Sequence, residues 1–249
     1  MSIVKAENLK VSVDNEAVLD GLSFEIEEKG IYVILSKSSI ETTELAKALA
    51  GVNDLDGGSV FHKDIELSDK KRGRALKSKI GYLPADSFLY PDMTAYETLD
   101  FTGRMRGVSP DKRMKQIKEA FELVALSQMS EVLVRDMSFS QKKRLMLANA
   151  LIGNPSVLIL DEPTAKVISE DAELIRDVIL MLGERKTVIV LTEKITLANQ
   201  IANHIGIIAK GKMALWSSLD NIKAKLNNDP NALLETFLAF TDDSVGGAT

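Results

Sequence analysis

Four short apolar runs limit the folds that are open to this chain. They occupy residues 31–35, 157–160, 187–191 and 205–209 and consist mostly of Ile, Val and Leu. A continuous apolar run of this length is typical of a strand that is buried on both faces, as in a parallel sheet. Helix-like segments such as 44–50 and 170–183 separate the runs, and helices between parallel strands imply a doubly wound sheet with right-handed crossovers. The sequence therefore predicts an α/β core.

Two other regions have different patterns. Segments 9–13 and 18–26 alternate in hydrophobicity around the turn-like Asp14-Asn15, which predicts an N-terminal antiparallel β subdomain. Residues 92–153 have helical periodicity, over 94–106, 111–124 and 141–152, and lack buried strands. We therefore expect one unit over 1–240, with a core at about 1–85 and 155–220, an inserted helical subdomain at about 86–154, and a flexible tail at 241–249.

Composition excludes several classes of function. Lys and Arg number 31 against 36 Asp and Glu, giving 31 − 36 = −5, and no dense basic run occurs, so nucleic acid is not an expected partner. The absence of cysteine excludes disulfides and thiolate chemistry. His62 and His204 are far apart in the sequence and suggest no zinc site. The first ten residues carry charges where a signal peptide needs an apolar core, which favours a cytoplasmic protein.

One predicted strand ends in a pair of acids, Asp161 and Glu162, followed by Pro163 and Thr164. In a nucleotide-binding α/β fold the carboxyl ends of the strands face the ligand. Asp161 could therefore hold Mg²⁺ there, and Glu162 could polarise a water molecule. The alternative is a turn that merely packs the fold.

From about residue 1 to 240 the chain resembles the nucleotide-binding subunits of ATP-binding cassette (ABC) transporters. The resemblance rests on several stretches in family order, at 19–24, 48–51, 80–84, 89–94 and 154–164. The closing segment at 234–238 is similar to the drug- and lipid-exporter branch. The resemblance implies a P-loop NTPase-like core with these subdomains.

The phosphate loop departs from the family pattern, Gly-x-x-Gly-x-Gly-Lys-Ser/Thr. Glycines in that pattern let backbone N–H groups approach the phosphates, and the lysine neutralises them. The five patterned positions are here Ser36, Ser39, Glu41, Thr42 and Thr43. The resemblance therefore implies that of these only Thr43, together with Asp161, could still bind Mg²⁺.

Charge argues against ordinary ATP binding in this loop. The lysine–phosphate attraction is missing, and Glu41 adds a like charge, each worth ~4 kcal/mol for unit charges about 4 Å apart at an effective dielectric of 20. Millimolar to micromolar affinity corresponds to only ~4–8 kcal/mol. We expect the Glu41 carboxylate instead to satisfy the free N–H groups at the start of the next helix.

The other family sites are altered too. The signature, Leu-Ser-Gly-Gly-Gln in the family, resembles 137–141 here, with Ser138 retained and Phe139 and Ser140 in place of the glycines. The γ-phosphate-sensing Gln is Ala85, and the switch His is Glu193. The adenine-stacking aromatic is Val13, and the loop after the acids is 166–168.

The main hypothesis is a cytoplasmic subunit on the inner face of the cell membrane, a degenerate pseudo-ATPase with a structural or regulatory role and no nucleotide cofactor. By resemblance, Phe88, Leu89 and Tyr90 would contact a transmembrane subunit, and an intact cassette could be a second partner. The first alternative is an active ATPase driving export, with Mg-ATP bound, Glu162 as general base and Lys37 replacing the lost lysine. A second is a soluble cassette protein in translation or repair.

Overall fold

The chain folds into two β-sheets with helices around them. The computed structural model describes residues 2–69, 71–86 and 89–242. Its strands are β1 Val4–Val13, β2 Glu16–Ile26, β3 Gly30–Leu35, β4 Gly57–His62, β5 Ile65–Glu66, β6 Ile80–Leu83, β7 Val157–Asp161, β8 Thr187–Thr192, β9 His204–Ala209 and β10 Lys212–Ser218. Its α-helices are α1 Ser39–Ala50, α2 Gly73–Lys77, α3 Ala95–Met105, α4 Pro110–Leu123, α5 Phe139–Leu151, α6 Ser169–Gly183, α7 Ile195–Ile201, α8 Leu219–Lys225 and α9 Ala232–Thr241.

The larger sheet contains the buried strands that the sequence predicts. Within the described residues its strand order is β10-β9-β3-β8-β7-β6. The strands β3, β6, β7, β8 and β9 run parallel, and β10 is antiparallel at one edge. Every residue of β3 and β8 is buried, as expected for central parallel strands covered on both faces. The predicted α/β class with a parallel sheet is confirmed.

Alternate residues of the parallel strands face two separate cores. Ile31, Val33 and Leu35 of β3 pack with helices α3 to α9. Tyr32 and Ile34, between them in sequence, pack on the opposite side with β1, β2 and α1. The two cores follow from the strand period of two, which sends successive side chains to opposite faces.

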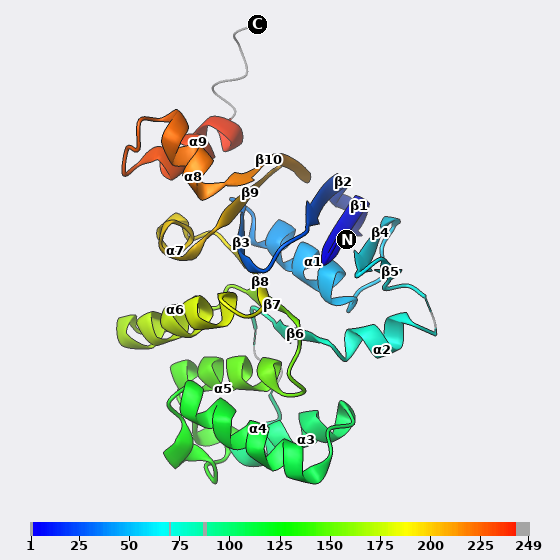
Figure 1. Cartoon of the computed structure of the whole chain (residues 1–249), viewed down its shortest axis with the longest axis vertical. Helices are drawn as coiled ribbons and strands as arrows, with labels where there is room; N and C mark the ends of the chain where they lie inside the picture. The colour runs from blue at the N-terminus through cyan, green and yellow to red at the C-terminus, as the bar shows by residue number, and fades with distance from the viewer. Residues whose placement is uncertain (1, 70, 87–88, 243–249) are drawn as a thin grey trace, which may run out of the picture.

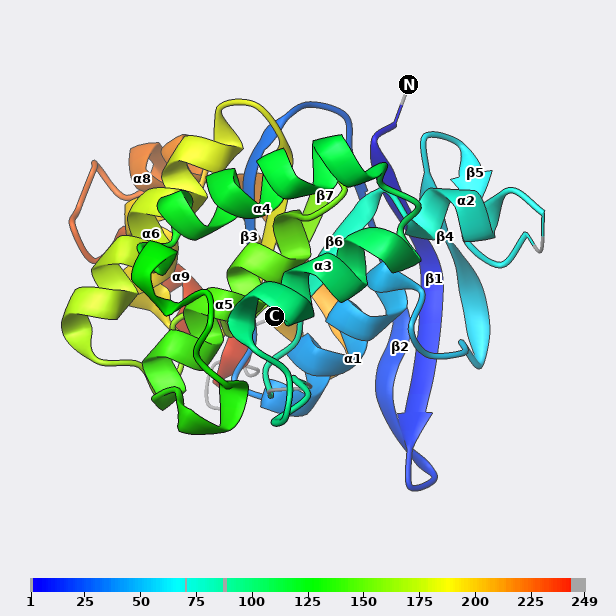
Figure 2. The same cartoon turned by 90° about the horizontal axis from the view of Figure 1, so that it is seen from below.

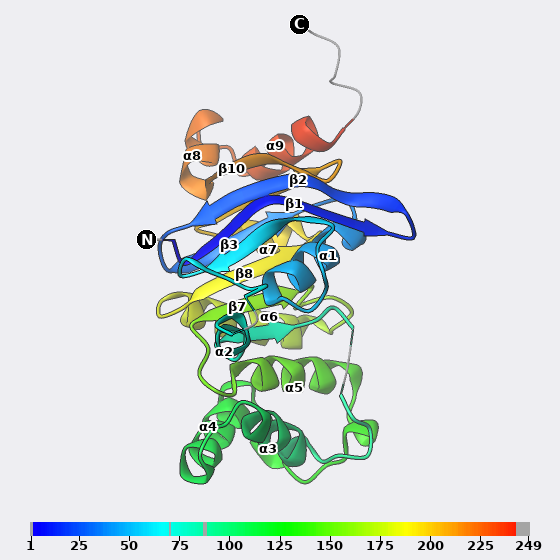
Figure 3. The same ribbon diagram turned by 90° about the vertical axis from the view of Figure 1, so that its right-hand side faces the viewer.

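The smaller sheet is the predicted N-terminal antiparallel one. Its order is β2-β1-β4-β5, and β1 pairs with β2 from Val4 opposite Ile26 to Val13 opposite Glu16. Figure 3 shows β1 and β2 running beside the strands of the larger sheet, with α1 next to them. Helix α1 therefore has sheet residues on both sides, and Leu45 and Leu49 are fully buried there.

Between β6 and β7 the chain forms a group of helices, α3, α4 and α5, at the end of the molecule opposite α8 and α9 (Figure 1). Seen from that end, these helices lie in front of the sheets (Figure 2). Thr94 caps the N-terminus of α3 and Ser138 caps that of α5, each with a complete capping box. Arg144 of α5 contacts Asp171 of α6 at 3.1 Å and so connects this group to the core.

The structure differs from several predicted boundaries; β1, for example, begins at Val4 rather than at residue 9. Helix α1 begins at Ser39 rather than near residue 44, because the Ser38 side chain accepts a hydrogen bond from the Glu41 N–H and caps an earlier turn. Thr241 ends α9, and Asp242 pairs with Lys37, so these two residues do not belong to a flexible tail. Residues 243–249 lie outside the described residues. Among the helices that the structure does describe, none has the length and apolarity needed to cross a bilayer.

Candidate functional site

The carboxyl ends of β3, β6, β7 and β8 share one edge of the larger sheet, and a cavity of about 610 Å³ lies there. The register of β6 and β7 places Leu83 opposite Leu160, so the turn after β6 runs beside the acids after β7. The cavity is lined by residues from several distant segments, among them Val13, Thr43, Ala85, Glu162, Lys166 and Glu193. The structure thus brings together most of the positions at which a nucleotide site was expected.

Thr43, which lines this cavity, contacts Asp161, which does not line it. The Thr43 hydroxyl donates a hydrogen bond to Asp161 Oδ2 at 2.9 Å. Asp161 is fully buried, and its Oδ1 has no hydrogen-bond partner within the described residues. Burial raises the pKa of Asp161 to about 6; the Thr43 hydroxyl lowers it, the nearby Glu162 charge raises it, and the Ala85 N–H, which lies close to the carboxylate, lowers it. A hydroxyl beside a carboxylate with an unpaired oxygen is a donor set that suits Mg²⁺.

The phosphate loop offers no comparable fit for phosphate. Glu41 lies in the first turn of α1, and its carboxylate accepts hydrogen bonds from the Ser36 hydroxyl and, at 2.7 Å, from the Gly211 N–H. Thr42 is fully buried and donates its hydroxyl to the Ser39 carbonyl at 3.0 Å. The cap of α1 comes from Ser38, so the expectation that the Glu41 carboxylate satisfies the helix amides is wrong. The carboxylate instead connects the loop to the turn between β9 and β10.

That turn depends on glycine. Gly211 has φ +74°, and a Cβ there would lie 2.8 Å from the Val18 carbonyl oxygen. Lys210, just before it, also has a positive φ, of +51°. Two successive positive φ values form a tight hairpin turn, which aims the Gly211 N–H at Glu41.

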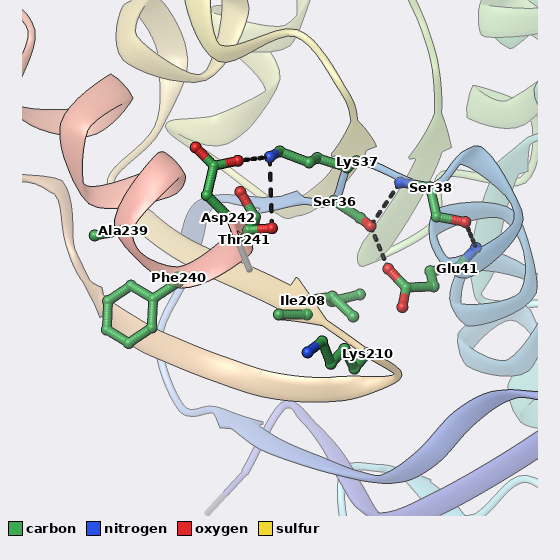
Figure 4. Close-up of a pocket in the computed structure, with 11 residues that line it drawn as sticks. Ser36, Lys37, Ser38, Glu41, Ile208, Lys210, Ala239, Phe240, Thr241 and Asp242 are labelled. Atoms are coloured by element: carbon green, nitrogen blue, oxygen red, sulfur yellow. Dashed lines mark hydrogen bonds and ion pairs between the residues drawn. The ribbon is translucent and has the colours of Figure 1, made fainter. Parts of the chain in front are cut away.

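Lys37 points to the C-terminal helix. Its ammonium forms an ion pair with Asp242 and donates to the Thr241 carbonyl at 3.4 Å (Figure 4). These contacts border a second cavity of about 550 Å³, between the loop, the end of β9 and the end of α9. Lys37, Ser36 and Glu41 line this second cavity and not the first, so the phosphate-loop positions are divided between the two.

Glu162 is held by the end of β8. Its Oε1 accepts from the Glu193 N–H at 2.6 Å, and its Oε2 accepts from the Thr192 hydroxyl at 3.1 Å. The backbone of Glu162 has φ +46°, which is unusual for a residue other than glycine. Both oxygens of the expected general base therefore already have donors.

The signature positions do not line this cavity. Ser138 caps α5, and the Ser140 hydroxyl accepts from the Ile168 N–H at 3.3 Å. Phe139 projects from the first turn of α5 and is 46% exposed. In this chain, therefore, the signature segment and the phosphate loop form separate surfaces.

Of the three residues expected to contact a membrane subunit, Phe88 lies outside the described residues. Leu89 is partly buried against the core. Tyr90 is 57% exposed and makes an edge-to-face contact with Phe101 of α3, with ring centres 6.0 Å apart. Of the two that the structure describes, Leu89 therefore packs against the core and Tyr90 lies at the surface.

Sequence reasoning missed Lys143, a buried lysine of α5. The signal was available, because Met146 and Leu147 lie three and four residues further on and place Lys143 on the buried face of the helix. The two histidines lie away from the cavity. His62 is buried against the Leu49 carbonyl, and His204 stacks on Tyr32. Among the described residues, no group of three or more His, Cys, Asp or Glu could hold a metal ion.

Comparison with known proteins gives one consistent relationship. The model of the family described as "ABC transporter" matches residues 19–165. The chain is 26% identical over 228 residues, 91% of its length, to the linearmycin resistance ATP-binding protein LnrL of Bacillus subtilis (strain 168), of which the match covers 73%. It is 27% identical over 210 residues, 84% of its length, to the Nod factor export ATP-binding protein I of Paraburkholderia xenovorans (strain LB400), covering 68% of that protein.

Solved structures share the fold. An ATP-binding subunit of an ABC transporter superposes with a TM-score of 0.84 at 16% identity, over 96% of this chain and 99% of that one. The dimeric cassette MJ0796, bound to ADP and Pi in a post-hydrolysis state, superposes with a TM-score of 0.78 at 22% identity, over 87% and 98% of the two chains.

Proposed function

This chain belongs to the ABC transporter family, and on that basis we propose that it is the ATP-binding-type subunit of a transporter complex and has lost nucleotide chemistry. The observation that carries the proposal is the position of Glu41 in the phosphate loop, with its carboxylate bonded to Ser36 and to Gly211. The subunit would then act through its contacts, as a structural or regulatory partner.

Charge supports this reading of the loop. A bound phosphate would approach the negative Glu41 without a lysine at position 42 to offset the repulsion, and each such unit-charge interaction is worth ~4 kcal/mol at about 4 Å. Lys37, the basic residue of the loop, is paired with Asp242. Drawing Lys37 into the site would require breaking that ion pair and turning the side chain away from α9.

Of the two acids after β7, only Glu162 supports the proposal. Thr43 and Asp161 would hold Mg²⁺ if it were present, and the ion would supply positive charge against bound phosphates. Glu162, however, accepts two hydrogen bonds from the end of β8 and would have to release at least one to activate a water molecule. The Thr43–Asp161 pair is compatible with a bound metal ion, whereas the phosphate loop and the contacts of Glu162 argue against nucleotide chemistry.

The intact Thr43–Asp161 contact favours one alternative, an active ATPase that drives export with Mg-ATP as cofactor. In that case Glu162 would be the base and nucleotide would displace the Glu41 carboxylate. The two functions differ in whether the chain binds Mg-ATP at all.

We also propose the partners and the location. A transmembrane subunit would dock on the surface around Leu89 and Tyr90, and an intact cassette could serve as a second partner. Two relatives are named as ATP-binding proteins of resistance or export, which agrees with a place on the inner face of the cell membrane.

Thermal unfolding with and without millimolar Mg-ATP tests the main proposal. A site filled to 100 times its Kd would add ~2.7 kcal/mol and raise Tm by several degrees. We expect no shift, with a catalytically active cassette as the positive control. A saturable shift that disappears in Thr43→Ala and Asp161→Asn would overturn the proposal.

Two further variants distinguish the effect of the missing lysine on ATP binding from the effect of the Glu41 carboxylate. Thr42→Lys alone should not restore binding, because Glu41 would pair with the new ammonium and still repel phosphate. Glu41→Gly/Thr42→Lys should bind measurably better than either single variant, as read by calorimetric titration. If Thr42→Lys alone binds as tightly as the double variant, Glu41 does not block the site.

A further inference from the structure

Lys143 is the largest of the side chains that the structure describes as almost completely buried, with 1% of its surface exposed. Its ammonium donates to the Ala85 carbonyl at 2.7 Å, and the Pro84 carbonyl lies 3.5 Å away. Lysine is rarely buried to this degree without a compensating charge, since removing an ammonium from water is costly. The compensation must come from the groups around the turn after β6.

The register of the sheet shows which groups these are. Leu83 lies opposite Leu160, so the chain that follows at Pro84 and Ala85 runs beside Asp161 and Glu162. Asp161 is fully buried, its carboxylate lies close to the Ala85 N–H, and its Oδ1 has no other donor within the described residues. Burial lowers the pKa of Lys143, and attraction to Asp161 and Glu162 raises it in part. A buried cation and a buried anion thus lie on two sides of one turn.

We propose that Lys143 is the internal counter-cation of Asp161 and Glu162 and weakens the binding of divalent cations at the Thr43–Asp161 pair. The α5 ammonium neutralises part of the charge that would otherwise attract Mg²⁺ or Mn²⁺. The inference rests on the proposed function for the assumption that this site holds no Mg-ATP in the cell.

The same contact has a structural consequence. The Lys143 ammonium connects the helical group between β6 and β7 to the strand ends of the larger sheet through the Ala85 carbonyl. A bound divalent cation would add positive charge beside this fixed ammonium. Repulsion between the two would weaken metal binding and would also loosen the contact between α5 and the sheet.

Binding of Mn²⁺ without nucleotide, followed by electron paramagnetic resonance at pH 8 so that Asp161 is ionised, tests the inference. We expect Lys143→Met to bind Mn²⁺ roughly tenfold more tightly than the unaltered chain. Lys142→Met is the matched control, because Lys142 is the next residue of α5 and directs its ammonium to the Arg135 carbonyl instead. It should change the Kd by about threefold or less. Asp161→Asn in the Lys143→Met background should abolish the gain.

Equal Mn²⁺ affinities for Lys143→Met and the unaltered chain would overturn the inference, as would equal gains in both lysine variants. If Lys143→Met fails to fold, Lys143→Met/Asp161→Asn should fold better, because the uncompensated carboxylate is gone. A double variant no more stable than the single one would also refute it. Because no nucleotide is added, ATP binding in the separate thermal assay would contradict the proposed function and leave this result standing.

Discussion

His62 is an ionisable residue held in its neutral form by the fold. It ends β4, is 2% exposed, and places Nε2 3.1 Å from the Leu49 carbonyl of α1. Burial lowers the pKa of His62 from 6.5 to about 4, and the Leu49 carbonyl raises it in part. Protonating this ring in the folded chain would therefore place an uncompensated charge between β4 and α1.

This lowered pKa predicts a loss of stability in acid. Above pH 6.5 His62 is neutral in both states and contributes no pH dependence. Below pH 6.5 the unfolded chain takes up a proton that the folded chain takes up only near pH 4, so stability falls as the pH falls. At pH 5 the loss should be about 2 kcal/mol.

Urea denaturation at pH 7.5 and pH 5 measures this loss of stability. His62→Gln is the reference, because an amide can still donate a hydrogen bond to the Leu49 carbonyl. The difference in unfolding free energy between the unaltered chain and His62→Gln should shift by about 2 kcal/mol in favour of the variant at pH 5. Comparing the two chains cancels other titrating groups, including Asp161, whose raised pKa acts in the opposite direction. A pH-independent difference would show that His62 is not held neutral.

Among the elements, α9 connects the C-terminal part of the chain to the phosphate loop. Its buried side, Leu233 and Phe237, packs in the core on one face of the parallel sheet, while its end reaches Lys37. The ion pair with Asp242 is about half exposed on both sides and contributes at most ~1 kcal/mol. The position of α9 therefore depends mainly on its apolar contacts.

Substituting two phenylalanines of α9, one buried and one exposed, compares the contributions of the two sides of the helix to stability. Phe237→Ala should lower the free energy of unfolding by about 3–5 kcal/mol, because it removes a buried ring from a packed core. Phe240→Ala, three residues along the same helix, removes a ring that is 44% exposed and should cost about 0.5 kcal/mol or less. Chemical denaturation of both variants checks the contrast. Equal losses would mean that α9 is held through its exposed side.

How much could be read from the sequence depends on the range of the interaction. The strands β3, β7, β8 and β9 were predictable because a run buried on both faces is apolar at every position. The start of α1 was missed because it depends on the Ser38 cap rather than on periodicity. The Glu41 contact with Gly211 joins residues 170 positions apart, and local pattern does not say which way a carboxylate points. The position of Lys143 was readable from helical period alone.

At the scale of the whole molecule, the proposed partner surface lies on the group of helices between β6 and β7. Tyr90 and Phe101 meet edge to face there, and both rings are more than two-fifths exposed. Met105 lies four residues beyond Phe101 on α3 and is also exposed. Aromatic side chains that stay exposed side by side are common anchors of protein interfaces, since they bury a large area with little loss of conformational freedom.

We expect Tyr90→Ala/Phe101→Ala to lose its membrane partner. Truncating interface anchors typically costs ~2 kcal/mol or more, which is roughly a thirtyfold loss of affinity. Because both side chains are partly exposed, the unfolding free energy should change by only about 1 kcal/mol. Co-purification from detergent-solubilised membranes measures the association, and circular dichroism confirms that the variant is folded.

Val52→Ala/Leu180→Ala is the matched control, because it removes two exposed apolar side chains that lie elsewhere, one in the segment after α1 and one on α6. Full retention of the partner by the folded Tyr90/Phe101 variant, or an equal loss in the control, would show that docking does not use this surface.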